Sequence, residues 1–283
     1  MSGLPNTRDP LPAWASVQAA GDIGAFLAAW LQADLLSGEE AAAFARYYAS
    51  YRRSFGPYMR HHYRNQTREL QDCLQGRARL RILEVGCGCG TESLWMALHG
   101  HAVRALDVSE KLLRVARARK QLLENAAHDR LDCEFELQSV LDLRDGGFDL
   151  IWMEQAFHHL EPRPDIVAKL GSLLAPGGRL IISESNAWNP LLQLMLYRLR
   201  GTKTVIRYNG VTWGNERVLT PGSLRRLLQP QGIEMESMRY YRMLPNRRWA
   251  ETLTGRAGIF DDSDHAWLRP LYTHYNFVGR KRA

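Results

Sequence analysis

The sequence predicts an α/β fold with a doubly wound, mostly parallel sheet, and three observations lead to this prediction. Residues 81–97, RILEVGCGCGTESLWMA, run from a short apolar stretch through three glycines into a helical pattern. That order is typical of a strand, a tight turn and a helix. Further apolar stretches alternate with helical segments as far as residue 184, which favours a sheet with helices on both faces. The residues before about 80 are helical in pattern and precede the first strand.

The three glycines of the first turn are Gly86, Gly88 and Gly90, and they indicate a binding site. Glycine suits backbone that turns sharply or approaches a ligand closely, because it has no Cβ to clash. The carboxyl ends of strands are where open α/β sheets bind nucleotides. The spacing E-x-G-x-G-x-G, which begins at Glu84, differs from the dinucleotide fingerprint G-x-G-x-x-G.

An acidic residue follows at a suitable interval. Residues 101–108, HAVRALDV, predict the second strand, and Asp107 lies at its end. A nucleotide-binding sheet places its ribose-binding carboxylate about this far beyond the glycines. Such a carboxylate could accept hydrogen bonds from both ribose hydroxyls. The alternative is a helix cap, in which Asp107 or Ser109 begins the helix that starts at residue 110.

Two later segments complete a resemblance to the class I S-adenosylmethionine (SAM) methyltransferases. Residues 148–160, FDLIWMEQAFHHL, resemble the fourth-strand motif of that family, and residues 174–184, LAPGGRLIISE, resemble its Leu-x-Pro-Gly-Gly turn before the fifth strand. With the glycine turn and Asp107, four features stand in the family's order. The resemblance implies a Rossmann-like sheet of seven strands with a last antiparallel strand. It also implies SAM as the cofactor, released as S-adenosyl-L-homocysteine.

The resemblance further implies which residues hold the cofactor. The three glycines would pass beneath the methionine part of SAM. Asp107 would hold the ribose, and Val108 would flank the adenine. Glu84 would orient the glycine turn or reach the amino group of SAM through water, and Glu154 would face the methionine half.

The adenine contact departs from the family pattern. Residues 131–137 predict the third strand, and Ser139 stands in the loop after it where the family commonly has an aspartate. The usual acidic contact to the adenine amine is therefore replaced. Ser139, the backbone N–H of Val140 or the carboxylate of Asp142 could supply it.

Two histidines, His158 and His159, follow the fourth strand and are the candidate catalytic bases. Histidine suits this role because its proton exchanges near neutral pH. We expect His159 to be the base ahead of His158. The alternative is that one of them only packs or caps.

The chain divides into a helical N-terminal extension, residues 1–78, and the SAM-binding domain, residues 79–283. Three helices are expected in the extension, over residues 23–35, 38–55 and 58–74. Ser37 and Glu40 have the spacing of a capping box for the second.

We expect the extension to act as a lid over the cofactor. The resemblance implies this, because N-terminal helices often cover the cofactor in small-molecule members of the family. Tyrosine combines apolar area with a polar tip, so Tyr47 and Tyr51 are candidate substrate contacts. The alternative for most of the aromatic residues here is core packing between helices.

Two insertions, at about residues 201–219 and 242–270, are expected to carry substrate specificity. The first contains Trp213, a candidate substrate contact, and the second is expected to be irregular. A helix over residues 191–200 could be core, bind a greasy substrate or touch a membrane surface. Residues 233–241 and 272–279 predict the last two strands.

The composition of this chain of 283 residues indicates which classes of partner to expect. Its formal net charge of +7 comes mostly from scattered arginines, so we expect no nucleic-acid partner. Four cysteines without paired C-x-x-C motifs make a structural zinc site unexpected, and no metal is predicted. The N-terminus lacks the pattern of a signal peptide, so the expected location is the cytoplasm.

The predicted activity is SAM-dependent methylation of a small molecule, most simply at oxygen. The substrate would belong to secondary metabolism or be lipid-like. The enzyme alternative is an RNA or protein methyltransferase. The other alternative is a SAM-binding subunit with no turnover of its own.

Overall fold

The computed structural model describes residues 10–53, 55–194, 205–208, 211–214, 217–245, 248–257 and 265–282. A seven-stranded sheet lies at its centre, in the order β3-β2-β1-β4-β5-β9-β8. The strands are β1 (Arg81–Val85), β2 (Ala102–Asp107), β3 (Cys133–Leu137), β4 (Phe148–Glu154), β5 (Leu174–Ser185), β8 (Ile233–Tyr241) and β9 (His274–Lys281). β9 runs opposite in direction to the other six strands of this sheet. The predicted doubly wound α/β fold is confirmed.

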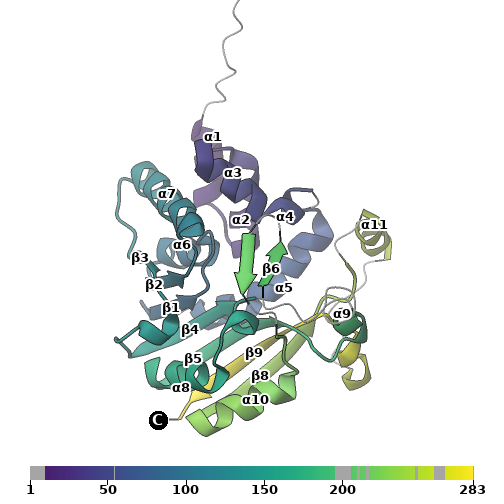
Figure 1. Ribbon diagram of the computed structural model, residues 1–283. Helices are drawn as coiled ribbons and strands as arrows, with labels where there is room; N and C mark the ends of the chain where they lie inside the picture. Colours follow the sequence, from purple (N-terminus) through teal and green to yellow (C-terminus); the bar gives the residue numbers. More distant parts are fainter. Residues whose placement is uncertain are drawn as a thin grey trace, which may run out of the picture.

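The sheet is buried on both faces. Along β4, Leu150 and Trp152 enter one apolar core, while Ile151 and Met153 enter the other. This alternation follows from the two-residue period of a strand, and it explains why β4 is apolar at four consecutive positions, residues 150–153. The first face is covered by α5 (Pro57–Leu74), α6 (Thr91–Leu98) and α7 (Glu110–Ala127), and the second by α8 (Arg163–Leu173) and α10 (Pro221–Leu228) (Figure 1).

Helices of the N-terminal region stack above the first face (Figure 1). They are α1 (Pro10–Gln18), α2 (Ile23–Ala33), α3 (Gly38–Tyr47) and α4 (Ala49–Arg53). The helix predicted over residues 38–55 is therefore two helices, and the predicted capping box is wrong, because the Ser37 side chain makes no capping hydrogen bond in the described structure. At the start of α2, Asp22 Oδ1 does accept a hydrogen bond from the backbone N–H of Ala25 at 2.7 Å.

A buried arginine on α7 joins these helices to the glycine turn. Arg119 Nη1 donates to the carbonyl of Cys89 at 2.7 Å and to Thr91 Oγ1 at 2.8 Å. The hydroxyl of Tyr48, just after α3, also bonds Thr91 Oγ1 at 2.7 Å. The guanidinium carbon lies near three ring centroids, those of Trp30 at 4.4 Å, Phe44 at 5.1 Å and Phe26 at 5.8 Å. Burial lowers the pKa of the fully buried guanidinium.

The segment after β5 turns into α9 (Pro190–Gln193), where Asn189 Oδ1 accepts a hydrogen bond from Leu192 at 2.9 Å. The predicted helix over residues 191–200 passes outside the described residues after residue 194. Next, β6 (Val205–Tyr208) and β7 (Val211–Gly214) pair as an antiparallel hairpin. Trp213 lies in β7, and its side chain is outside the described part.

The insert between β8 and β9 is partly helical, so its prediction as irregular is wrong. It contains α11 (Arg248–Ala257) and the 3-10 helix η5 (Ala266–Leu271). Glu251 on α11 accepts hydrogen bonds from the backbone N–H groups of Tyr58 and Met59, which begin α5. A local sequence pattern cannot predict a tertiary contact of this kind. Among the described helices, none is long and apolar enough to traverse a bilayer.

We expect Arg119→Ala to lower the free energy of unfolding by about 2–4 kcal/mol, because it empties a buried cage and leaves the Cys89 carbonyl without its donor. Urea unfolding measures this. The matched control is Arg114→Ala on the same helix, where the side chain is half exposed and the change should stay within about 0.5 kcal/mol. Equal losses in the two variants would contradict the role given to Arg119.

Candidate functional site

The glycine turn lies at the carboxyl end of β1, and glycine is required at each of its three positions. All three have left-handed backbones, with φ of +80° at Gly86, +52° at Gly88 and +71° at Gly90. A Cβ on Gly86 would lie 2.5 Å from the Cβ of Ala156. A Cβ on Gly88 would collide with the hydroxyl of Tyr47, and one on Gly90 would lie 2.7 Å from the ring of Phe135. The backbone of this turn is therefore closely packed from several sides.

The carboxylate of Asp107 lies against this turn at the end of β2. Its Oδ2 accepts a hydrogen bond from the backbone N–H of Gly88, and its Oδ1 accepts one from Ser109, both at 2.8 Å. Burial raises the pKa of Asp107, and the backbone N–H donors oppose that rise. Ser109 makes no side-chain cap on α7. The Asp107 carboxylate is thus held beside the glycines, and the residue at the N-cap of α7 is Ser109 rather than Asp107.

Two apolar side chains are exposed next to Asp107. Val108, which follows β2, is 77% exposed, and Leu137, at the end of β3, is 52% exposed. Leu137 is the register partner of Asp107, so these side chains belong to adjacent strand ends. Exposed apolar groups at the ends of buried strands suit a flat aromatic base. The hydroxyl of Ser139 accepts a hydrogen bond from Leu141 at 3.2 Å and begins the 3-10 helix η1 (Val140–Asp142), whose first residue, Val140, is buried.

Three carboxylates are enclosed between the glycine turn and α5. Glu84 on β1, Glu92 on α6 and Glu154 on β4 accept hydrogen bonds from neutral donors, namely Ser93, Tyr63 and Gln66 in that order. Burial raises the pKa of all three, and mutual repulsion adds to it for Glu84 and Glu154. Carboxylates held among neutral donors suit a ligand that brings positive charge, as the sulfonium and ammonium of SAM do. The residues present therefore fit this cofactor.

A histidine–carboxylate pair lies at the carboxyl ends of β4 and β5. His158, in the 3-10 helix η2 (Phe157–His159), places Nδ1 2.6 Å from Glu184 Oε1, and its backbone N–H donates to Oε2 at 3.0 Å. Ser185 N–H donates to the same carboxylate at 2.7 Å. Burial alone would raise the pKa of Glu184, but His158 and these N–H groups outweigh it and lower that pKa. Because Nδ1 faces Glu184, proton exchange falls to Nε2 of His158.

The second histidine has a different setting. The ring of His159 lies 3.9 Å from that of His158 and is half-buried. The bond to Glu184 orients the His158 ring, and this favours His158 as the base, the reverse of the order expected from sequence. Just before them, Gln155 has φ of +47°, and its backbone N–H donates to Ser183 at 2.9 Å. Such strain is typical of functional sites.

The predicted substrate tyrosines lie on the N-terminal side. The hydroxyl of Tyr47 packs against Gly88, and burial, with repulsion from Tyr48, Glu154 and Asp107, raises its pKa. Tyr47 thus lies closer to the cofactor residues than to the histidines. Tyr51 is half-buried in a ring cluster, 5.6 Å from the ring of Tyr63.

Sequence reasoning missed Glu92 and Glu184. Glu184 ends the apolar run LIISE of β5, and a lone carboxylate after a buried strand could have identified it. No comparable signal marks Glu92, because it lies on the helix α6, whose residues follow a helical rather than a strand period.

A polar wall continues this edge beyond β5. Tyr241 ends β8, level with His274 of β9 and Ser185 of β5, and Arg242 follows it. The Tyr241 hydroxyl bonds Ser183 Oγ at 2.8 Å. Burial, aided by the charge of Arg242, lowers the pKa of His274 and lowers that of His62 on α5 to about 2. Both rings are therefore neutral at neutral pH.

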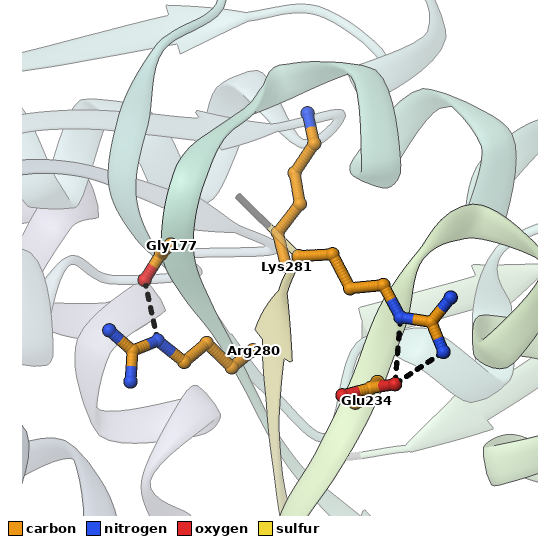
Figure 2. Close-up of a pocket in the computed structure, with 5 residues that line it drawn as sticks. Gly177, Glu234, Arg280 and Lys281 are labelled. Carbon is orange, nitrogen blue, oxygen red and sulfur yellow. Dashed lines mark hydrogen bonds and ion pairs between the residues drawn. The ribbon is translucent and has the colours of Figure 1, made fainter.

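A separate pocket lies at the other end of the sheet, where β5 and β8 begin (Figure 2). Its cations are already engaged. Arg280 donates to the carbonyl of Gly177 at 3.2 Å, Lys281 to that of Leu174 at 2.7 Å, and Arg282 pairs with Glu234. None of the residues described at the glycine turn lines this pocket. In the described ranges, no cluster of three potential ligands is arranged for a metal ion.

Comparisons with known proteins show which proteins this chain resembles. A family profile described as a methyltransferase domain matches residues 83–180. The chain is 32% identical over 123 residues to 27-O-demethylrifamycin SV methyltransferase of Amycolatopsis mediterranei, covering 42% of this chain and 44% of that protein. It is 30% identical over 176 residues to the ubiquinone biosynthesis O-methyltransferase of Bordetella avium, covering 60% of this chain and 68% of that protein.

Coverage of other relatives is smaller. The alignment with methyltransferase GfsG of Streptomyces halstedii, at 32% identity, covers 42% of each chain, so the chain spans less than half the length of several curated relatives. Among solved structures, magnesium protoporphyrin IX methyltransferase of Synechocystis PCC 6803 with bound SAM aligns with a TM-score of 0.54 at 16% identity. It covers 93% of this chain and 99% of that one, a likeness of fold.

The depressed pKa of His62 predicts acid sensitivity. Below its ordinary value of 6.5, the unfolded chain takes up a proton that the folded chain refuses until about pH 2, so stability falls as pH falls. Between pH 7 and 5 we expect the parent chain to lose about 2 kcal/mol more than His62→Gln. Chemical unfolding at both pH values measures this. The exposed His128, replaced by Gln, is the control, and equal losses in His62→Gln and parent would refute the prediction.

Proposed function

The chain belongs to the class I SAM-dependent methyltransferases, and from this premise we propose that it transfers the methyl group of SAM to a hydroxyl oxygen of a small molecule. The observation that carries this proposal is the His158–Glu184 pair beside the glycine turn. A hydroxyl must lose its proton as it is methylated, and an oriented histidine is suited to take it. A methyltransferase for a more easily methylated atom would not need such a pair.

Different residues are assigned to different parts of SAM. We assign the ribose to Asp107 and the adenine to the apolar surface of Val108 and Leu137, with the backbone N–H of Val140 as the nearest candidate for its polar edge. The glycine turn and the buried carboxylates Glu84, Glu92 and Glu154 serve the methionine half. Closed burial of this half excludes water and strengthens these electrostatic contacts.

When bound, SAM supplies a methyl group activated by a positively charged sulfur. The residues of the chain position the acceptor and take up its proton. Glu184 holds the His158 ring through Nδ1 so that Nε2 accepts the acceptor's proton, and its negative charge stabilises the imidazolium that results. Holding the acceptor in line with the methyl group lowers the entropic part of the barrier.

We assign a lid role to the N-terminal region, residues 1–78. The contact of Tyr47 with Gly88 and the bond of Tyr48 to Thr91 support it, because both bring this region against the glycine turn. Tyr47 then contacts the cofactor and shields it from solvent, rather than serving the acceptor alone.

The acceptor class is a secondary metabolite or a lipid-like compound. The relatives named for rifamycin and ubiquinone methylation support a small hydroxylated acceptor. An apolar rim after β5 supports a greasy one: Trp188 is 44%, Leu191 63% and Leu194 46% exposed, close to the catalytic edge. The same rim is where a peripheral membrane contact would form.

Asp107→Ala should weaken SAM binding at least tenfold, because the ribose hydroxyls lose a charged acceptor worth about 1.5–3 kcal/mol. Titration calorimetry measures the affinity, and thermal unfolding checks the fold. The control is Asp129→Ala, which removes an exposed carboxylate after α7. Unchanged affinity in Asp107→Ala would remove the ribose assignment.

The proposed reaction is tested with methyl-labelled SAM, the purified chain and a cell extract separated into small molecules, lipids, RNA and protein. Label should enter the small-molecule or lipid fraction, and His158→Ala should reduce it about 100-fold or more while SAM affinity holds. His159→Ala is the matched control, with a much smaller effect. Glu184→Gln should lie between them.

Label in RNA or protein would overturn the acceptor class. If His158→Ala and His159→Ala both keep the parent rate and pH profile, neither histidine acts as a base.

A further inference from the structure

Arg242 lies at the catalytic edge and is held in a strained conformation. Its φ is +63°, in the left-handed region that a non-glycine residue seldom adopts. The backbone N–H and hydroxyl of Thr273 both donate to its carbonyl, each at 2.7 Å. Two residues on, the Tyr58 hydroxyl bonds the backbone of Leu244 at 2.9 and 3.0 Å. The turn is therefore fixed on both sides, and strain maintained in this way is typical of functional positions.

The edge on which Arg242 lies is the one that carries the base. β8 runs parallel to β5, because both are antiparallel to β9, and Tyr241 and Ser185 share His274 as their register partner. Arg242 therefore follows the strand end that lies two strands from Glu184. The backbone of Arg242 directly follows Tyr241, the register partner of His274, and its positive charge lowers the pKa of His62 and of His274.

The guanidinium is half-buried and has no salt bridge within the described part of the chain. The carboxylates on the elements that pack at this edge are engaged elsewhere. Glu69 binds Arg239 and Asn276, Glu154 binds Gln66, Glu184 binds His158, and Glu251 caps α5. A half-buried arginine in a fixed backbone, with its neighbouring carboxylates committed, is prepared for an anion from outside.

We propose that Arg242 binds a carboxylate group carried by the methyl acceptor. This inference rests on the proposed function, because it concerns the acceptor of that reaction. The planar guanidinium fork matches a carboxylate with two parallel hydrogen bonds, and the bond would fix the acceptor at a point away from the reacting hydroxyl.

The charges along the polar wall beyond β5 favour a ligand group with a single negative charge. His62 and His274 stay neutral at neutral pH, so among Arg242, His62 and His274 the positive charge is that of Arg242. A monoanionic carboxylate is balanced by one guanidinium, whereas a phosphate dianion would keep an uncompensated charge in a half-buried position.

The test compares 4-hydroxybenzoate and 3,4-dihydroxybenzoate with their carboxamides, which have the same shape without the charge. Titration calorimetry is run on the full chain saturated with S-adenosyl-L-homocysteine. At least one acid should bind ten or more times tighter than its amide. Arg242→Gln should remove that preference by weakening the acid alone, and Arg242→Lys should keep part of it, since charge remains without the fork.

Arg226→Gln is the matched control, because it removes an exposed arginine from α10 and should leave the preference intact. Thermal unfolding and S-adenosyl-L-homocysteine affinity show whether each variant is folded. Equal affinity for acid and amide in the parent chain, undetectable binding of both included, would overturn the proposal. So would an acid preference that survives in Arg242→Gln.

Failure of the proposed function is distinguishable from these outcomes. A chain that binds the acid through Arg242 but labels no small molecule would refute the reaction and keep the carboxylate site. A chain that methylates small molecules while ignoring the acid group would refute the carboxylate site alone.

Discussion

The arrangement of the whole site depends on the buried guanidinium of Arg119. It ties the glycine turn, through Cys89 and Thr91, to an aromatic cage formed by α2 and α3. Cation–π contacts of a desolvated guanidinium are each worth about 2 kcal/mol or less, so several rings together compensate for part of the cost of burying the charge. As a result, the N-terminal helices and the cofactor turn form one packed unit, and Tyr47 reaches Gly88 from a fixed base.

Charge is divided across the catalytic edge in a way that suits methyl transfer from a cation. On the glycine side, buried carboxylates accept hydrogen bonds from neutral donors. Toward β8, the committed carboxylates and neutral histidines leave Arg242 to face the acceptor. His158 and Glu184 lie between these two regions. A positive methyl donor and an acidic acceptor would thus each meet complementary charge, and each would be held away from the other's pocket.

The sequence predicted what depends on local pattern. The alternation of strands and helices along residues 81–184, the glycine turn and the place of Asp107 follow from spacing and periodicity within short windows. What it could not predict depends on partners distant along the chain. The Glu184–His158 bond joins residues 26 apart, and the cage joins Arg119 of α7 to rings on α2 and α3. The capping box at Ser37 fails although its spacing is right, and α11 forms where no strong periodicity was evident, since packing against α5 stabilises it.

The most direct test of this account is a crystal structure of the chain with S-adenosyl-L-homocysteine. The account predicts both ribose hydroxyls on Asp107, the adenine ring against Val108 and Leu137, and the homocysteine part enclosed by the glycine turn, Tyr47 and the buried carboxylates. It also predicts Arg119 in its aromatic cage and the His158–Glu184 bond intact. A ligand bound elsewhere, or a nucleoside whose ribose does not touch Asp107, would contradict it.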